Sequence, residues 1–190
     1  MTSGGPCRVI LIGMMGSGKS TIGRRLAART GWPYLDNDEL VRRAHGTTAR
    51  RILAARGEVA MRQAESDALA LGLETPPPVI IGVAAGTILD HDDRERLRRG
   101  GIVVWLRADA ATLERRASGG EHRPWVDTAG AGWIREAVAR RAPLYASVAD
   151  VTIDTGRSSP ARAAAELRGR LGPTGCADDL MSDEPPPPRT

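Results

Sequence analysis

The residues at positions 13–20, Gly-Met-Met-Gly-Ser-Gly-Lys-Ser, have the types and spacing that bind a phosphate group. They match the pattern Gly-x-x-x-x-Gly-Lys-Ser/Thr in full, between an apolar run and a segment with helical periodicity. Glycines allow a tight loop whose backbone N–H groups face the phosphate, and the N-terminus of the following helix adds partial positive charge. We therefore expect a nucleotide to be bound by Gly16, Ser17, Gly18, Lys19, Ser20 and Thr21.

Lys19 is the only lysine of the chain, although lysine and arginine together number 27. Lysine is a compact charge with rotatable donors, whereas arginine is a planar fork, so the two are not interchangeable at a crowded phosphate site. In loops of this kind the lysine bridges the β- and γ-phosphates, and the hydroxyl that follows it ligates Mg²⁺. We therefore expect Lys19 to be the essential cation and Ser20 to be a metal ligand.

A second cluster, Asp36-Asn37-Asp38, follows a short segment expected to be a strand. In an open parallel sheet, ligands bind at the carboxyl ends of the strands, where these two carboxylates would lie. Phosphoryl transfer needs a group that orients the nucleophile, so one carboxylate could serve a metal ion and the other the acceptor. The alternative is that Asp38 only caps a helix that begins at Glu39.

Arginines are the candidates for binding an anionic acceptor. Arg62 lies in a helical segment, Arg123 in a loop rich in glycine, and Arg140 and Arg141 precede an Ala-Pro-Leu-Tyr run. By spacing alone, each of them is more often a solvated surface residue than a ligand contact. Loops that close over phosphates commonly carry an arginine, which favours a role for Arg123.

Short apolar runs alternate with helical patterns, which predicts a five-stranded parallel sheet covered by helices on both faces. The expected strands are 8–12, 33–35, 79–82, 102–106 and 151–153. The expected helices are 19–30, 39–44, 48–56, 58–73, 92–99, 109–117, 133–146 and 160–171. We expect one domain over 7–172, a mobile loop at 118–132, and disordered tails at 1–6 and 173–190.

Composition narrows the class of protein. The net charge of +4 comes without a long basic run, which argues against a nucleic-acid partner. No apolar stretch approaches the ~20 residues of a membrane span, and we expect no membrane association. Cys7 and Cys176 do not make a disulfide framework, so we expect a reducing cytoplasm. The three histidines show no metal-ligand spacing.

Taken together, these stretches resemble the shikimate kinase family over most of the chain, from Val9 to about Leu171. The match includes the phosphate loop, the Asp-x-Asp at 36–38 and an Arg-Pro pair at 123–124. It also includes Gly57-Glu58, Met61-Arg62, Glu65, Leu89-Asp90, Arg94 and Arg140-Arg141-Ala142-Pro143-Leu144-Tyr145.

This resemblance implies a nucleoside-monophosphate-kinase-like α/β fold, with strand order 2-3-1-4-5, and a monomer. The implied reaction transfers a phosphoryl group from ATP to shikimate, giving 3-phosphoshikimate for aromatic amino-acid biosynthesis. Asp38 would orient the acceptor hydroxyl or act as its base, and Arg62 and Arg141 would grip the carboxylate. The remaining implied roles are on the nucleotide side: Arg123 on the phosphates, Asp36 on Mg²⁺ through water, and Arg116 near the adenine.

One departure from the family pattern concerns the acceptor. Where the family has three glycines after the third strand, this chain has Ala84-Ala85-Gly86, and Ala85 and Gly86 are expected to contact the acceptor. Two added methyl groups could narrow that pocket. The alternatives are therefore a kinase of another small hydroxy acid, such as gluconate, or a nucleotide-binding protein without transfer activity.

Overall fold

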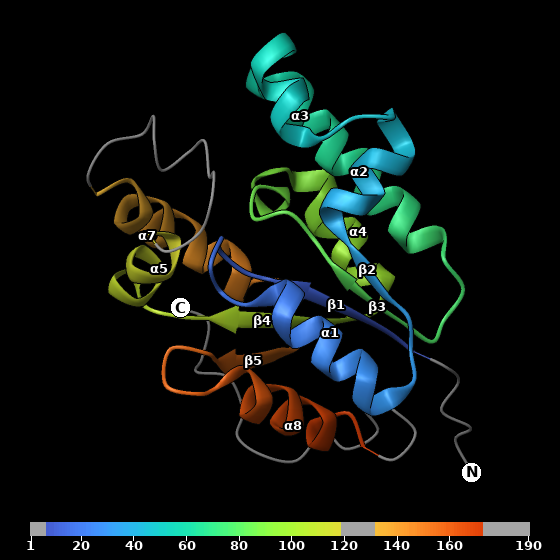
Figure 1. The fold of residues 1–190 in the computed structure, drawn as a ribbon, viewed down its shortest axis with the longest axis vertical. Coiled ribbons are helices and arrows are strands. Elements are labelled where there is room, and N and C mark those ends of the chain that lie inside the picture. The colour runs from blue at the N-terminus through green and yellow to red at the C-terminus, as the bar shows by residue number, and fades with distance from the viewer. Residues whose placement is uncertain (1–6, 119–131, 173–190) are drawn as a thin grey trace.

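The computed structural model of the protein describes residues 7–118 and 132–172. Its centre is one parallel sheet with the strand order β2-β3-β1-β4-β5 (Figure 1). This arrangement confirms the predicted α/β fold and its order. The strands are β1 (Arg8–Ile12), β2 (Tyr34–Asp36), β3 (Val79–Gly82), β4 (Ile102–Arg107) and β5 (Val151–Asp154).

Helices cover both faces of the sheet (Figure 1). α1 (Lys19–Thr30) and α8 (Pro160–Arg170) pack on one face, and the buried residues of α3 (Ala49–Glu74), α4 (His91–Gly100) and α7 (Trp133–Ala146) lie on the other. Successive side chains of a strand point to opposite faces, so the alternating residues of β1 divide between two apolar clusters. The remaining described helices are α2 (Asn37–His45), the 3₁₀ turn η1 (Thr87–Leu89) and α5 (Ala110–Ser118).

The predicted break between helices 48–56 and 58–73 lies inside α3. Gly57 has φ 81° and ψ −179°, which is not helical, so α3 consists of two helical pieces joined at this glycine. A positive φ of this size favours glycine. The sequence did not predict η1, because a three-residue 3₁₀ turn carries no periodic pattern that a sequence could show.

The structure bears on two expectations drawn from composition, one about the cysteines and one about membrane spans. Cys7, just before β1, is disulfide-bonded, so the inference of a reducing compartment from unpaired cysteines is not supported. Among the described residues, no helix has the length and apolar character needed to cross a bilayer. The expected tails at 1–6 and 173–190, and all but the first and last residue of the expected loop at 118–132, lie outside the described residues.

Candidate active site

A cavity of about 650 Å³ lies at the carboxyl ends of β1, β2 and β3. The loop between β1 and α1 lines one end of it, and side chains from α2, α3 and α7 line the other. Parallel strands place their carboxyl ends at one edge, which is why residues distant in the sequence meet here. The cavity therefore brings the predicted phosphate loop and the predicted acceptor residues into one space.

The glycines of the phosphate loop allow its tight backbone, and the Lys19 side chain is hydrogen-bonded to that backbone. Gly13 has φ 140°, and a Cβ atom there would lie 2.6 Å from the carbonyl oxygen of Leu106. The Lys19 ammonium donates to the carbonyl oxygens of Gly13 at 2.8 Å and Met14 at 3.1 Å, so it lies over the loop itself. Gly18, with φ 98°, precedes the first turn of α1, whose N–H groups point toward the cavity side of the loop.

Asp36 and Asp38 both line the cavity, but only one of them caps the helix. Asp36 is the N-cap of α2, and its Oδ1 accepts from the backbone N–H of Asp38 at 3.1 Å. The alternative in which Asp38 caps a helix beginning at Glu39 is therefore wrong, since α2 begins at Asn37. The Asp38 carboxylate is exposed in the first turn, where it is available to a ligand.

Arg62 points into the acceptor end from α3 and is paired with two acidic residues of the same helix. Its guanidinium donates to Glu65 at 2.7 Å and to Glu58 at 3.0 Å. Burial opposes its charge, but Glu65 and Glu58 outweigh burial and raise the pKa of Arg62. Burial raises the pKa of Glu65, against the pull of Arg62. The buried Glu65 carboxylate thus holds the Arg62 guanidinium in place at the acceptor end.

Arg141 reaches the same end from α7 and is almost fully buried, with 4% of its surface exposed. It donates to the carbonyl oxygen of Ala85 at 3.2 Å, and its guanidinium carbon lies 5.9 Å from the centre of the Trp133 ring. Burial lowers the pKa of Arg141. Within the described residues its Nε has no hydrogen-bond partner, which leaves donor capacity for an anion.

The Ala84-Ala85-Gly86 segment forms the wall between these two arginines. Its first two residues are partly buried and line the cavity, and the carbonyl of Ala85 also accepts from the Tyr145 hydroxyl at 2.8 Å. A Cβ atom at Gly86 would lie 1.6 Å from Nη1 of Arg62. The chain therefore keeps glycine at the point where Arg62 presses on the backbone.

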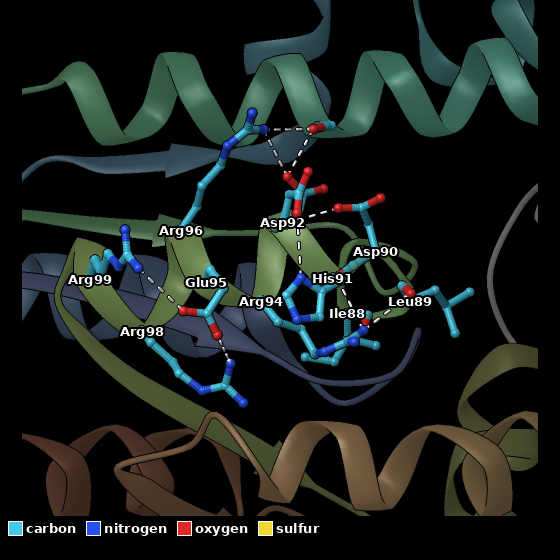
Figure 2. A network of polar contacts seen from close by, with 12 residues as sticks. Ile88, Leu89, Asp90, His91, Asp92, Arg94, Glu95, Arg96, Arg98 and Arg99 are labelled. Carbon is cyan, nitrogen blue, oxygen red and sulfur yellow. Dashed lines mark hydrogen bonds and ion pairs between the residues drawn. The ribbon is translucent and has the colours of Figure 1, made fainter.

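α4 supports the Ala84-Ala85-Gly86 segment through hydrogen bonds to η1 and to α3. Figure 2 shows the Arg94 guanidinium at the end of η1, where it donates to the carbonyls of Ile88 and Leu89 at 2.9 Å and 3.1 Å. The carboxylate of Asp93, 2% exposed, accepts from the Ser66 hydroxyl of α3 at 2.8 Å. These bonds tie η1 and α3 to one helix, so they fix the wall relative to Arg62.

On the nucleotide side, Arg116 of α5 lines the cavity next to the phosphate loop. Its guanidinium donates to the carbonyl oxygens of Gly16 at 3.4 Å and Thr155 at 2.7 Å. Arg116 thus links the phosphate loop to the residue that follows β5. Arg123, expected on the phosphates, lies outside the described residues.

The family model for shikimate kinase matches residues 15–171 of the chain. The chain belongs to the shikimate kinase family. A shikimate kinase of Symbiobacterium thermophilum is 40% identical over 166 residues, which are 86% of this chain and 95% of that protein. One of Xanthomonas oryzae pv. oryzae is 38% identical over 164 residues, covering 86% of this chain and 91% of that protein.

Solved shikimate kinases have the same fold. The enzyme of Acinetobacter baumannii in complex with shikimate is 30% identical, with a TM-score of 0.80, over 87% of this chain and 93% of that one. A gluconokinase of Sinorhizobium meliloti, at 20% identity and a TM-score of 0.52, shares the fold alone. The shikimate kinase comparisons therefore cover the acceptor end as well as the phosphate loop.

Among the residues that line the cavity of this shikimate kinase family member without a predicted role are Tyr34, Glu65 and Trp133. Glu65 could have been found as the i+3 partner of Arg62, because opposite charges at that spacing meet on a helix. Tyr34 read as an ordinary strand residue and Trp133 as the start of a helix. No local pattern distinguishes either of them from a core aromatic.

Proposed function

We propose that the protein transfers the γ-phosphoryl group of ATP to the 3-hydroxyl of shikimate. One observation carries the proposal: a single cavity contains Lys19 and Ser20 at one end and Asp38, Arg62 and Arg141 at the other. Family membership and the shikimate-bound relative support this choice of acceptor. Phosphoryl transfer depends on positioning and charge neutralisation, and this cavity supplies groups for both substrates.

The donor half consists of the phosphate loop with Gly16, Ser17, Gly18 and Thr21, and of Arg116 beside it. Backbone N–H groups and Lys19 neutralise the phosphate charge that builds up during transfer. Arg116 donates to the carbonyl groups of Gly16 and Thr155, and we propose that it borders the adenine base of ATP. Arg123 keeps its proposed role on the phosphates, on the argument from sequence alone.

The acceptor half recognises a carboxylate and a hydroxyl. Arg141 offers a buried Nε that has no hydrogen-bond partner in the part of the chain that the structure describes, and Arg62 lies against Gly86 on the other side of the wall. Guanidinium groups bind carboxylates with two parallel hydrogen bonds, which fixes the ring of the acceptor. Asp38, exposed at the cavity edge, then orients the hydroxyl or accepts its proton.

Mg²⁺ fits the oxygen groups between the two halves. Ser20 and Asp36 both line the cavity, and the Asp36 carboxylate accepts from the hydroxyl of Tyr34 at 3.2 Å. The described residues contain no cluster of three acidic, cysteine or histidine side chains, which agrees with an ion held largely by substrate phosphates and water. When bound, Mg²⁺ would neutralise phosphate charge; Ser20 would hold it directly and Asp36 through water.

The finer features of this proposal follow the same reasoning. We propose a single kinase domain over 7–172 that works as a monomer in the cytoplasm. These statements are inferred from the family to which the chain belongs. A sedimentation measurement of the purified protein with and without ATP tests the monomer, since a dimer would double the mass.

The function is tested by ADP release from the purified protein with ATP and Mg²⁺. Shikimate, gluconate and no acceptor are compared, and Lys19→Ala serves as the inactive control. We expect release with shikimate only. ADP release with gluconate but not with shikimate would make gluconate the acceptor. If neither acceptor increased ADP release, the kinase assignment would be overturned.

A further inference from the structure

Tyr34 of β2 is held between two glycines at the edge of the active site. A Cβ atom at Gly23 of α1 would lie 2.2 Å from Cε2 of the Tyr34 ring. A Cβ atom at Gly82, the last residue of β3, would lie 2.3 Å from the Tyr34 hydroxyl oxygen. Any residue larger than glycine at position 23 or 82 would therefore clash with Tyr34. The orientation of the Tyr34 ring is fixed by this close packing.

The Tyr34 hydroxyl holds a carboxylate of the active site. It donates to Oδ2 of Asp36 at 3.2 Å. A phenol hydroxyl has one hydrogen, and the Asp36 carboxylate can only accept. The other oxygen of Asp36 accepts from the backbone N–H of Asp38 at 3.1 Å, so each oxygen of this carboxylate has a donor.

This arrangement matters for a metal ion. A carboxylate oxygen that accepts one hydrogen bond keeps a second lone pair for a water molecule bound to the metal. Outer partners that orient a ligand in this way contribute to metal affinity. Tyr34 orients the Asp36 carboxylate, which Arg24 also approaches at 3.7 Å.

We propose that Tyr34 is a positioning residue for Mg²⁺, because its hydroxyl orients Asp36 for the metal–nucleotide complex. The inference rests on the proposed function, in which Asp36 holds Mg²⁺ through water. It goes beyond that proposal by assigning a role to a side chain of the cavity that had none.

The two tyrosines of the chain make a matched pair of variants. Tyr34→Phe removes one oxygen and keeps the ring that packs between Gly23 and Gly82. Tyr145→Phe also removes one phenol oxygen, but that hydroxyl bonds the carbonyl of Ala85 at the acceptor end. The first variant is therefore expected to affect the metal and the second to affect shikimate binding.

The experiment is a calorimetric titration of the full chain with ADP, once with saturating Mg²⁺ and once with EDTA. We expect Mg²⁺ to strengthen ADP binding by the unmodified protein. In Tyr34→Phe we expect this Mg²⁺-dependent gain to fall about five- to tenfold, the range of one oriented hydrogen bond near a metal, with affinity in EDTA unchanged. Tyr145→Phe should keep the gain and raise the KM for shikimate.

Asp36→Asn supplies a second measurement. If Tyr34 acts through Asp36, adding Tyr34→Phe to Asp36→Asn should weaken the Mg²⁺-dependent gain by less than it does alone. Full additivity would overturn the inference, as would equal losses of ADP affinity with Mg²⁺ and with EDTA. If the unmodified protein shows no Mg²⁺-dependent gain, the inference fails, whereas the acceptor assay above decides the transfer function independently.

Discussion

At the nucleotide end of the cavity, the loop at 13–20 supplies most of the ligand-facing groups, chiefly backbone N–H groups, and Arg116 lies beside it. At the acceptor end, separate elements each supply a part: Asp38 from α2, Arg62 from α3, Ala85 after β3 and Arg141 from α7. One end is thus local in sequence and made of main chain. The other end is assembled by the fold and made of side chains.

This difference separates the expected effects of mutation. Groups at the nucleotide end stabilise charge that develops during transfer, so their loss should lower kcat. Groups at the acceptor end hold the substrate equally before and during transfer, so their loss should raise the KM for shikimate. The variants below test this division, beginning with the largest expected effect.

Lys19→Arg tests whether charge alone suffices at the nucleotide end. The Lys19 ammonium fits within 2.8 Å of the Gly13 carbonyl, where a planar guanidinium is larger and directs its donors differently. We expect kcat to fall about 100- to 1,000-fold, the cost of losing one well-placed donor to the transition state. Steady-state ADP release with varied ATP and shikimate measures it.

The KM for shikimate is the internal control of this variant and should change by less than about twofold. Lys19→Ala sets the lower limit of activity. If Lys19→Arg kept most of the kcat, the single lysine in an arginine-rich chain would reflect no chemical requirement, and the proposed contrast between the ends would lose its main support.

The same contrast explains how much the sequence could predict. The phosphate loop is readable because its glycines and Lys19 are adjacent, and the strand order follows from alternating strands and helices together with the family resemblance. The burial of Arg141 could not be read, because neighbouring Arg140 has the same residue type and is exposed. Only the packing of α7 against the sheet distinguishes the two arginines.

Arg141→Lys tests the acceptor end. Arg141 is 4% exposed and keeps Nε available, so lysine would lose the paired donors that suit a carboxylate. A charge-assisted pair is worth about 2 kcal/mol, and we expect the KM for shikimate to rise about 30-fold with little change in kcat. Kinetics at fixed saturating ATP measure this change.

Arg140→Lys is the matched control, because it makes the same substitution one position earlier on the exposed side of α7. Its kinetics should match those of the unmodified protein. A large fall in kcat with unchanged KM in Arg141→Lys would contradict the division, since it would place Arg141 among the groups that act only during transfer.

Ala85→Gly makes the smallest expected change. The Ala85 carbonyl is fixed by Arg141 and Tyr145, so removing the methyl group should enlarge the pocket without moving the wall. We expect the KM for shikimate to fall about twofold, a modest gain because glycine also loosens the backbone. The same kinetic assay detects it.

Gly86→Ala gives the opposite change at the neighbouring position and should raise the KM, because its Cβ would meet Arg62 at 1.6 Å and displace that flexible guanidinium. If Ala85→Gly instead left the KM unchanged or raised it, the methyl group does not crowd the acceptor. In that case the two alanines are accommodated by the wall, and the glycine at Gly86 alone is required, because it is the position where an arginine approaches the backbone.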